Sequence, residues 1–203
     1  MKPLRIIMQG ALAVAALAAL PSVQALAAPT ETTRAGSTSV QLAPEFLKAL
    51  TALKVTPAPI APGRLNVRRG GVKAAFPITT GAVDLGTVKG EIGHEGGLSL
   101  SANGKRVELS AFLIDVTGTR PVLTGLAVVD DSLVGRLPLF DLHLSASRVD
   151  ADDELLKVDW VRVTLSQEAA DALNQIFSVD AFTAGFPIGT AKIRAVLESA
   201  GKH

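Results

Sequence analysis

The chain has 203 residues and is nearly neutral, with 20 Lys and Arg against 19 Asp and Glu. A net charge of +1 gives no overall field that would attract nucleic acid or an anionic membrane, so neither is predicted as a partner. The absence of cysteine excludes disulfides, thiol catalysis and thiolate metal sites, and the absence of tyrosine removes a common ligand residue.

The first 27 residues have the layout of a secretory signal peptide. Lys2 and Arg5 form a short basic start, residues 6–20 are mostly apolar, and the stretch closes on the small residues of Ala25-Leu26-Ala27. An uncleaved anchor would need about 20 apolar residues to span a bilayer, and this run is shorter. We therefore predict a signal peptide over residues 1–27, export to the extracellular space or cell envelope, and no membrane span after cleavage.

The rest of the chain is predicted to form one domain after a short tail. Residues 28–39 are small, polar and aperiodic, which predicts a flexible N-terminus. Residues 40–203 are then expected to form a single β-rich domain. Within it, residues 56–63 hold three prolines and a glycine, which predicts an extended linker over the surface.

From about residue 64 to residue 165 the dominant period of the apolar residues is two. Val72, Ala74, Phe76 and Ile78 alternate with more polar or smaller neighbours, as in a half-buried strand. Turn signals separate such runs, and the strongest is Asn103-Gly104, where both residues accept a positive φ. The sequence therefore predicts a mainly β fold, an antiparallel β-sandwich or barrel with two short helices.

The two helices are predicted over residues 44–53 and 167–177, where the apolar spacing changes to that of a helix face. Pro44 suits the first turn of the first helix, and Ser166 is a natural N-cap for the second. Glu168 lies near the positive end of the second helix dipole, which favours a helix start there.

The two helices also belong to a predicted internal repeat of strand–helix–strand units, over residues 40–83 and 163–193. The pattern Val-x-Leu, Glu, Ala-Leu occurs in both units, and Phe-Pro-Ile follows in both, at residues 76–78 and 186–188. The alternative is chance similarity, because such pairs of residues are common.

His94 lies in a glycine-rich segment, and Gly93, His94, Gly96 and Gly97 are the candidate ligand-binding residues. Glycines let a ligand or a backbone approach closely, and a neutral imidazole there could ligate a metal or haem iron. The alternative is a hairpin loop in which the glycines supply only turn geometry and His94 is solvated.

The pattern Gly93-His94-x-Gly96-x-Leu98, followed by an alternating strand, resembles the central motif of HtaA-type domains. These are exported modules of Gram-positive bacteria associated with haem uptake, and the likeness covers the β-rich run of about residues 71–144. It implies haem as a possible cofactor, with His94 beside the haem and a tyrosine as its axial ligand, whereas this chain has no tyrosine. The chain also resembles exported actinobacterial proteins that carry a helix–strand duplication.

Three further groups of polar residues are candidate sites. Asp141 and His143 share a strand face, which suits a general base or a polar outer face. Residues 150–154 hold four carboxylates, which suits Ca²⁺ or a solvated turn. A basic cluster is a candidate interaction surface or a charged edge strand that resists aggregation. Its members are Arg64, Arg68, Arg69 and Lys73.

These residues form no catalytic constellation and no metal site, so the sequence predicts that the protein is not an enzyme. The primary expectation is an exported binding or interaction domain without a cofactor, whose partner is a cell-envelope component or another protein. The alternative is a carrier of haem or another small ligand, of the HtaA type.

Overall fold

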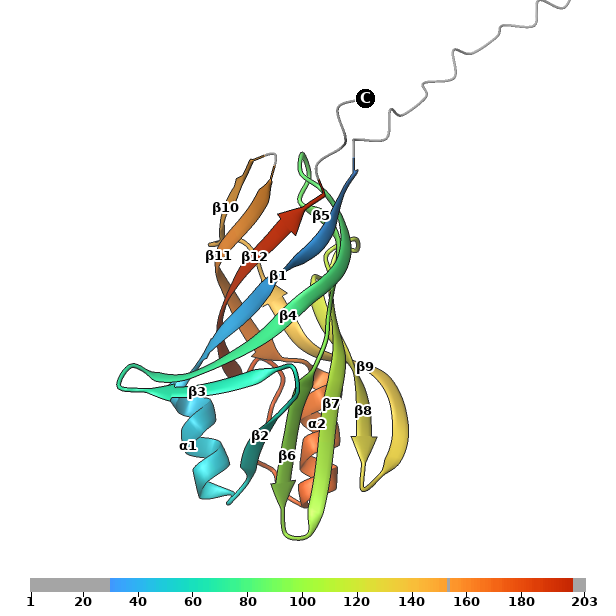
Figure 1. Ribbon diagram of the computed structural model, residues 1–203. Helices are drawn as coiled ribbons and strands as arrows, with labels where there is room; N and C mark the ends of the chain where they lie inside the picture. The colour runs from blue at the N-terminus through green and yellow to red at the C-terminus, as the bar shows by residue number, and fades with distance from the viewer. Residues whose placement is uncertain (1–29, 153, 199–203) are drawn as a thin grey trace, which may run out of the picture.

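The computed structural model describes residues 30–152 and 154–198, and the predicted signal peptide lies outside them. Eight strands form a closed antiparallel barrel in the order β7-β5-β4-β1-β12-β11-β9-β8, because β8 also pairs with β7. Strands β2, β3 and β10 extend the sheet from β6, β4 and β11 (Figure 1). The predicted fold class is therefore confirmed, with a barrel in place of the sandwich alternative.

Twelve strands and two helices follow one another along the described chain. The first half contains β1 (Thr30–Leu42), α1 (Pro44–Ala52), β2 (Thr56–Ile60), β3 (Arg64–Arg68), β4 (Gly71–Asp84), β5 (Lys89–His94) and β6 (Gly97–Ala102). The second half contains β7 (Lys105–Asp115), β8 (Val122–Val129), β9 (Ser132–His143), β10 (Arg148–Ala151), β11 (Leu155–Leu165), α2 (Gln167–Phe177) and β12 (Pro187–Leu197).

The barrel interior is filled by the inward-facing residue of each alternating pair, as the period of two requires. Ala74, Phe76 and Ile78 of β4 are buried, while Lys73 beside them is exposed. Phe76 also packs edge-on against Phe112 of β7, with ring centroids 4.9 Å apart. Burial of this apolar surface is the main force that holds the barrel together.

Both helices follow the end of a strand and lie at the same end of the barrel (Figure 1). Their bounds, Pro44–Ala52 and Gln167–Phe177, agree with the prediction. Ser166 caps α2: its hydroxyl accepts a hydrogen bond from the N–H of Ala169 at 3.0 Å and donates one to the carbonyl of Pro138 at 2.7 Å. The cap thereby ties the start of α2 to β9.

Replacing Ser166 by alanine should lower the free energy of unfolding by about 1–2 kcal/mol, because both hydrogen bonds are lost at a fully buried position. Thr51→Ala is the matched control, since that hydroxyl makes one exposed bond, to Leu47 O within α1. Urea denaturation of both variants measures the difference. An equal effect in the two variants would contradict a structural role for the cap.

The predictions for two segments are wrong, and in both cases a segment expected to be irregular forms a strand. Residues 30–39, expected to be flexible, lie in β1, which pairs with both β4 and β12. Residues 56–60, expected to be linker, form β2, which pairs with β6 at the edge of the sheet. Prolines are tolerated on an edge strand because one side of its backbone needs no partner. In both segments, pairing with distant strands supplies the order that the local sequence does not indicate.

The two units of the predicted repeat have similar local topology but different registers. β1 is followed by α1 and pairs with β4, while β11 is followed by α2 and pairs with β12. Pro77 pairs with Ser37, and its counterpart in the second unit, Pro187, pairs with Thr164. In the alignment of the two units, however, Thr164 corresponds to Gln41 and not to Ser37. The repeated Phe-Pro-Ile segments are therefore offset by four residues relative to the preceding strands, and the duplication stays a prediction.

Candidate functional site

His94 ends β5 and faces the barrel interior, where it is 6% exposed. Its Nδ1 lies 3.2 Å from the carbonyl oxygen of Phe112, and its Nε2 lies 2.7 Å from the hydroxyl oxygen of Thr38. Because a carbonyl can only accept, the network assigns the ring proton to Nδ1, and Nε2 accepts from the Thr38 hydroxyl. Both ring nitrogens therefore have protein partners.

Burial lowers the pKa of His94 to about 4, against an ordinary value of 6.5, because the charged ring would lose its hydration. Backbone hydrogen bonds to Phe112 and Ile92 oppose this effect in part. The imidazole is therefore neutral at pH 7. The alternative of a solvated His94 in a hairpin loop is wrong, since the ring is enclosed by β1 and β7.

The glycines around His94 serve the wall of the barrel. Gly96 has a φ of +78°, and a Cβ there would lie 2.7 Å from the carbonyl oxygen of Ile60. A Cβ on Gly97 would collide with the backbone of β7, 2.9 Å from the Cα of Ser110. Of the four candidate ligand-binding residues, His94 alone lines the cavity described next; the glycines permit close strand packing.

An apolar cavity of about 120 Å³ runs through the barrel interior beside His94. Among its described lining side chains, only His94 and Thr38 carry polar atoms. The cavity reaches the end of the barrel where α2 lies. Half-buried or exposed apolar side chains form the lip there, namely Leu98, Val129, Val134, Leu137 and Ile176.

Thr38 is a site residue that the sequence interpretation missed. It is 2% exposed and belongs to β1, within the segment that was expected to be flexible. The signal that could have found it is the alternation of Thr38, Val40 and Leu42 with Ser39 and Gln41, which already has the period of a strand.

Asp141 and His143 share the outer face of β9 but do not interact as a catalytic pair. The Asp141 carboxylate accepts a hydrogen bond from Arg120 at 2.7 Å, while His143 Nε2 lies 2.8 Å from the hydroxyl of Thr164. Both side chains are half-buried. This arrangement supports the interpretation as a polar outer strand face over that of a general base.

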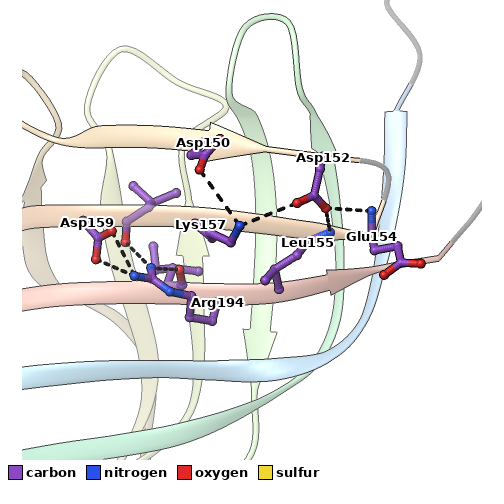
Figure 2. A network of polar contacts seen from close by, with 9 residues as sticks. Asp150, Asp152, Glu154, Leu155, Lys157, Asp159 and Arg194 are labelled. Carbon is purple, nitrogen blue, oxygen red and sulfur yellow. Dashed lines mark hydrogen bonds and ion pairs between the residues drawn. The ribbon is translucent and has the colours of Figure 1, made fainter.

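Of the acidic segment, Asp150 lies in β10, while Asp152 and Glu154 lie between β10 and β11 (Figure 2). Asp152 accepts hydrogen bonds from the N–H groups of Glu154 and Leu155, which hold the pKa of its carboxyl below the ordinary value. The Lys157 ammonium lies 3.9 Å from Asp150 and 3.5 Å from Asp152. Within the part of the chain that the structure describes, which omits Asp153, no three acidic or histidine side chains are grouped to hold a metal ion.

The basic cluster lies on the hairpin of β3 and β4. Arg64 and Arg68 belong to β3, Arg69 lies in the turn, and Lys73 belongs to β4. All four side chains are exposed. None of them lines the apolar cavity, so the two candidate surfaces of the sequence analysis are separate places on the molecule.

No helix in the described ranges is long and apolar enough to cross a membrane. No protein-family model matches the sequence, and no curated protein matches it either.

Solved structures do resemble the barrel. The C-terminal domain of HtaA from Corynebacterium glutamicum has a TM-score of 0.62 at 18% identity, over 83% of this chain and 99% of that one. The N-terminal domain of HtaA scores 0.57 at 14% identity, over 82% and 99%. The heme binding protein HtaB of the same organism scores 0.57 at 11% identity, over 84% and 96%. The chain therefore has an HtaA-like fold.

Proposed function

We propose that this exported protein is a non-enzymatic carrier of a small apolar ligand, which it holds in the barrel cavity. The observation that supports this proposal is an apolar cavity that opens at one end of the barrel through a lip of half-buried aliphatic side chains and the exposed Val134. Pockets lined mainly by apolar residues with a few polar groups are the usual sites for small ligands.

The polar pair in the cavity restricts the ligand's chemistry. The Thr38 hydroxyl donates to His94, and His94 donates to the Phe112 carbonyl, so neither side chain needs a hydrogen bond from a ligand. A polar group of a ligand beside His94 would lose its hydration and find the Thr38 hydroxyl oxygen as its single side-chain acceptor among the described lining residues. A cavity of about 120 Å³ is comparable to the ~150 Å³ cavity that binds benzene in an engineered protein. The ligand is therefore a small apolar molecule, or the apolar end of a longer one that extends past the lip.

Haem is the second candidate, and the shared fold with the heme binding protein HtaB favours it. The described residues fit haem poorly. The chain has no tyrosine or cysteine to serve as an axial ligand, and both ring nitrogens of His94 are engaged. The cavity is also smaller than the roughly 300–1,000 Å³ of pockets that enclose drug-sized ligands.

Two neighbouring residues of β9 provide a sharp test of the carrier proposal. Val134 lines the cavity and is 56% exposed, while Leu133 is 69% exposed and is not among the lining residues. The fluorescent probe N-phenyl-1-naphthylamine should bind the wild type and be displaced by a fatty acid. Val134→Asp should weaken probe binding at least tenfold, because the bound probe would cover the new carboxylate and remove part of its hydration. Leu133→Asp should leave probe binding unchanged.

Failure of the wild type to take up the probe, or equal effects of the two substitutions, would overturn the apolar-carrier proposal. A haemin titration tests haem, the second candidate ligand, independently of the apolar probe. A Soret shift that is lost in His94→Ala would establish haem carriage and overturn our assessment of the fit. If neither probe nor haemin bound, the interaction-domain alternative would be favoured.

A further inference from the structure

A second inference concerns the outer surface of the barrel and is independent of the cavity. Residues paired across antiparallel strands project their side chains to the same face of the sheet. Ser39 of β1 pairs with Ala75 on one side and Lys192 on the other, and Ala75 pairs with Arg64. A second row passes from Asn66 through Lys73, Gln41 and Thr190 to Arg162.

We call the outward surface of β3, β4, β1, β12 and β11 around these rows the basic face. Arg68 and Arg194 extend it, through their pairings with Gly71 and Ser37. On this face six cations lie beside a single carboxylate, Asp159, although the whole chain is nearly neutral. The cations are Arg64, Arg68, Lys73, Arg162, Lys192 and Arg194. Past Arg194, the row that it shares with Ser37 continues to Lys157 and Asp150, which form an ion pair with each other.

The single carboxylate leaves most of this charge uncompensated. Asp159 accepts two hydrogen bonds from Arg194, at 2.7 and 2.9 Å (Figure 2). Its carboxylate also lies 3.8 Å from the ammonium of Lys192. Within residues 30–152 and 154–198, the other four cations have no carboxylate within 4.0 Å. Clustered like charges without partners attract an anionic ligand.

Hydrogen-bonding groups are interleaved with the cations. A hollow of about 610 Å³ on this face is lined by Ser37, Ser39, Gln41 and Asn66 together with three of the cations. The Gln41 amide donates to the carbonyls of Gly70 and Val72, at 3.3 and 3.1 Å, which anchors the β3–β4 turn beside the hollow. Hydroxyl and amide groups in a fixed hollow suit a ligand that carries many hydroxyls.

Trp160, the single tryptophan of the chain, is 59% exposed at the β11 edge of this face. It has a φ of 65° and lies where the register between β11 and β12 shifts, opposite Lys192. A bulky residue with positive φ is strained, and such strain is concentrated at functional sites. The Lys192 ammonium lies 4.9 Å from the ring centroid, so a flat apolar surface adjoins a cation.

We propose that the basic face binds an anionic glycan, a sugar polymer that carries phosphate or carboxylate groups. The cations would pair with the acidic groups, the hollow would bind sugar hydroxyls, and Trp160 would stack on the apolar side of a sugar ring. A membrane surface is disfavoured because the described residues of these five strands include only two large exposed apolar side chains, Val67 and Trp160, and these lie on the outermost strands of the face, β3 and β11. Single-stranded nucleic acid is disfavoured because its bases require several stacking aromatics.

The test uses the purified protein with polygalacturonate and phosphodextran, which separate carboxylate from phosphate, and with neutral dextran as the control polymer. Binding to at least one anionic polymer should weaken with added salt. Arg68→Glu/Lys73→Glu should weaken it at least tenfold. Trp160→Ala should also weaken it while keeping the salt dependence. Lys54→Glu/Lys89→Glu, the same charge change away from this face, should bind like the wild type.

If the protein bound neither anionic polymer, or if the two double variants lost binding equally, the proposal would be overturned. Tighter binding to phosphatidylglycerol vesicles or to single-stranded DNA than to either glycan would also overturn it. Val134→Asp should bind the glycan like the wild type, so failure of the cavity proposal and failure of this one are distinguishable.

Discussion

Replacing Leu50 or Leu173 by alanine is expected to lower the free energy of unfolding by about 2–5 kcal/mol, because each substitution leaves a cavity in packed surroundings. Leu50 of α1 is 2% exposed, and Leu173 of α2 is 8% exposed. Leu133→Ala, at a site 69% exposed, is the matched control and should change stability by less than about 0.5 kcal/mol. Urea denaturation measures all three, and wild-type midpoints in both helix variants would show that the helices are peripheral.

The two leucines should differ in their effect on ligand binding. Leu173 lines the apolar cavity, whereas Leu50 is not among its lining residues. Leu173→Ala should therefore enlarge the cavity and change its affinity for N-phenyl-1-naphthylamine, while Leu50→Ala should change stability alone. Unchanged probe affinity in Leu173→Ala would place the probe outside the cavity.

Acidification from pH 7 to pH 4 is expected to cost about 3 kcal/mol of stability through His94 alone, because its pKa is about 4 when folded against 6.5 when unfolded. The unfolded chain binds the proton first as the pH falls. The contribution is therefore fully present well above pH 6.5, falls progressively between pH 6.5 and pH 4, and is gone below about pH 4. No other described side chain lining the cavity is titratable, so the effect belongs to one group.

His94→Gln should flatten the dependence of stability on pH between 6.5 and 4, whatever its effect on stability at neutral pH. His143→Gln, the same substitution on the outer face of β9, is the matched control for the loss of a histidine. Asp115 and Asp130, whose pKa values are lowered by hydrogen bonds from an ordinary 3.8, lose their stabilising contribution mainly below pH 4, outside this range, and do so equally in both variants. Denaturation midpoints measured at intervals of half a pH unit compare the slopes. An unchanged slope in His94→Gln would contradict a buried, neutral imidazole.

Features decided within a few residues were predictable from the sequence. Ser166 could be assigned as an N-cap because the capping bond is made three residues along the same chain. Asn103 and Gly104 have φ values of 51° and 76°, as expected for a tight turn between β6 and β7. The inward residues of β4 could be predicted because a strand exposes alternate side chains to opposite faces.

Features decided by contact between distant segments were not predictable in this way. Thr30–Leu42 is ordered by β4 and β12, which lie far away along the chain, and β2 is ordered by β6 in spite of its prolines. The basic residues of β3 and β4 were visible as a cluster, but Lys192 and Arg194 join them only through pairing of β12 with β1.

The sequence by itself determined a β-rich domain with two helices, one of them capped by Ser166, and it singled out His94 as the side chain of most interest. The tertiary structure decided the surroundings of that side chain. Closure of β7 onto β8 turned the sheet into a barrel, and the same closure buried His94 against Thr38 and Phe112. The physical reason is that solvation and hydrogen bonding of a side chain depend on every strand around it, whereas local sequence specifies only the strand that carries it.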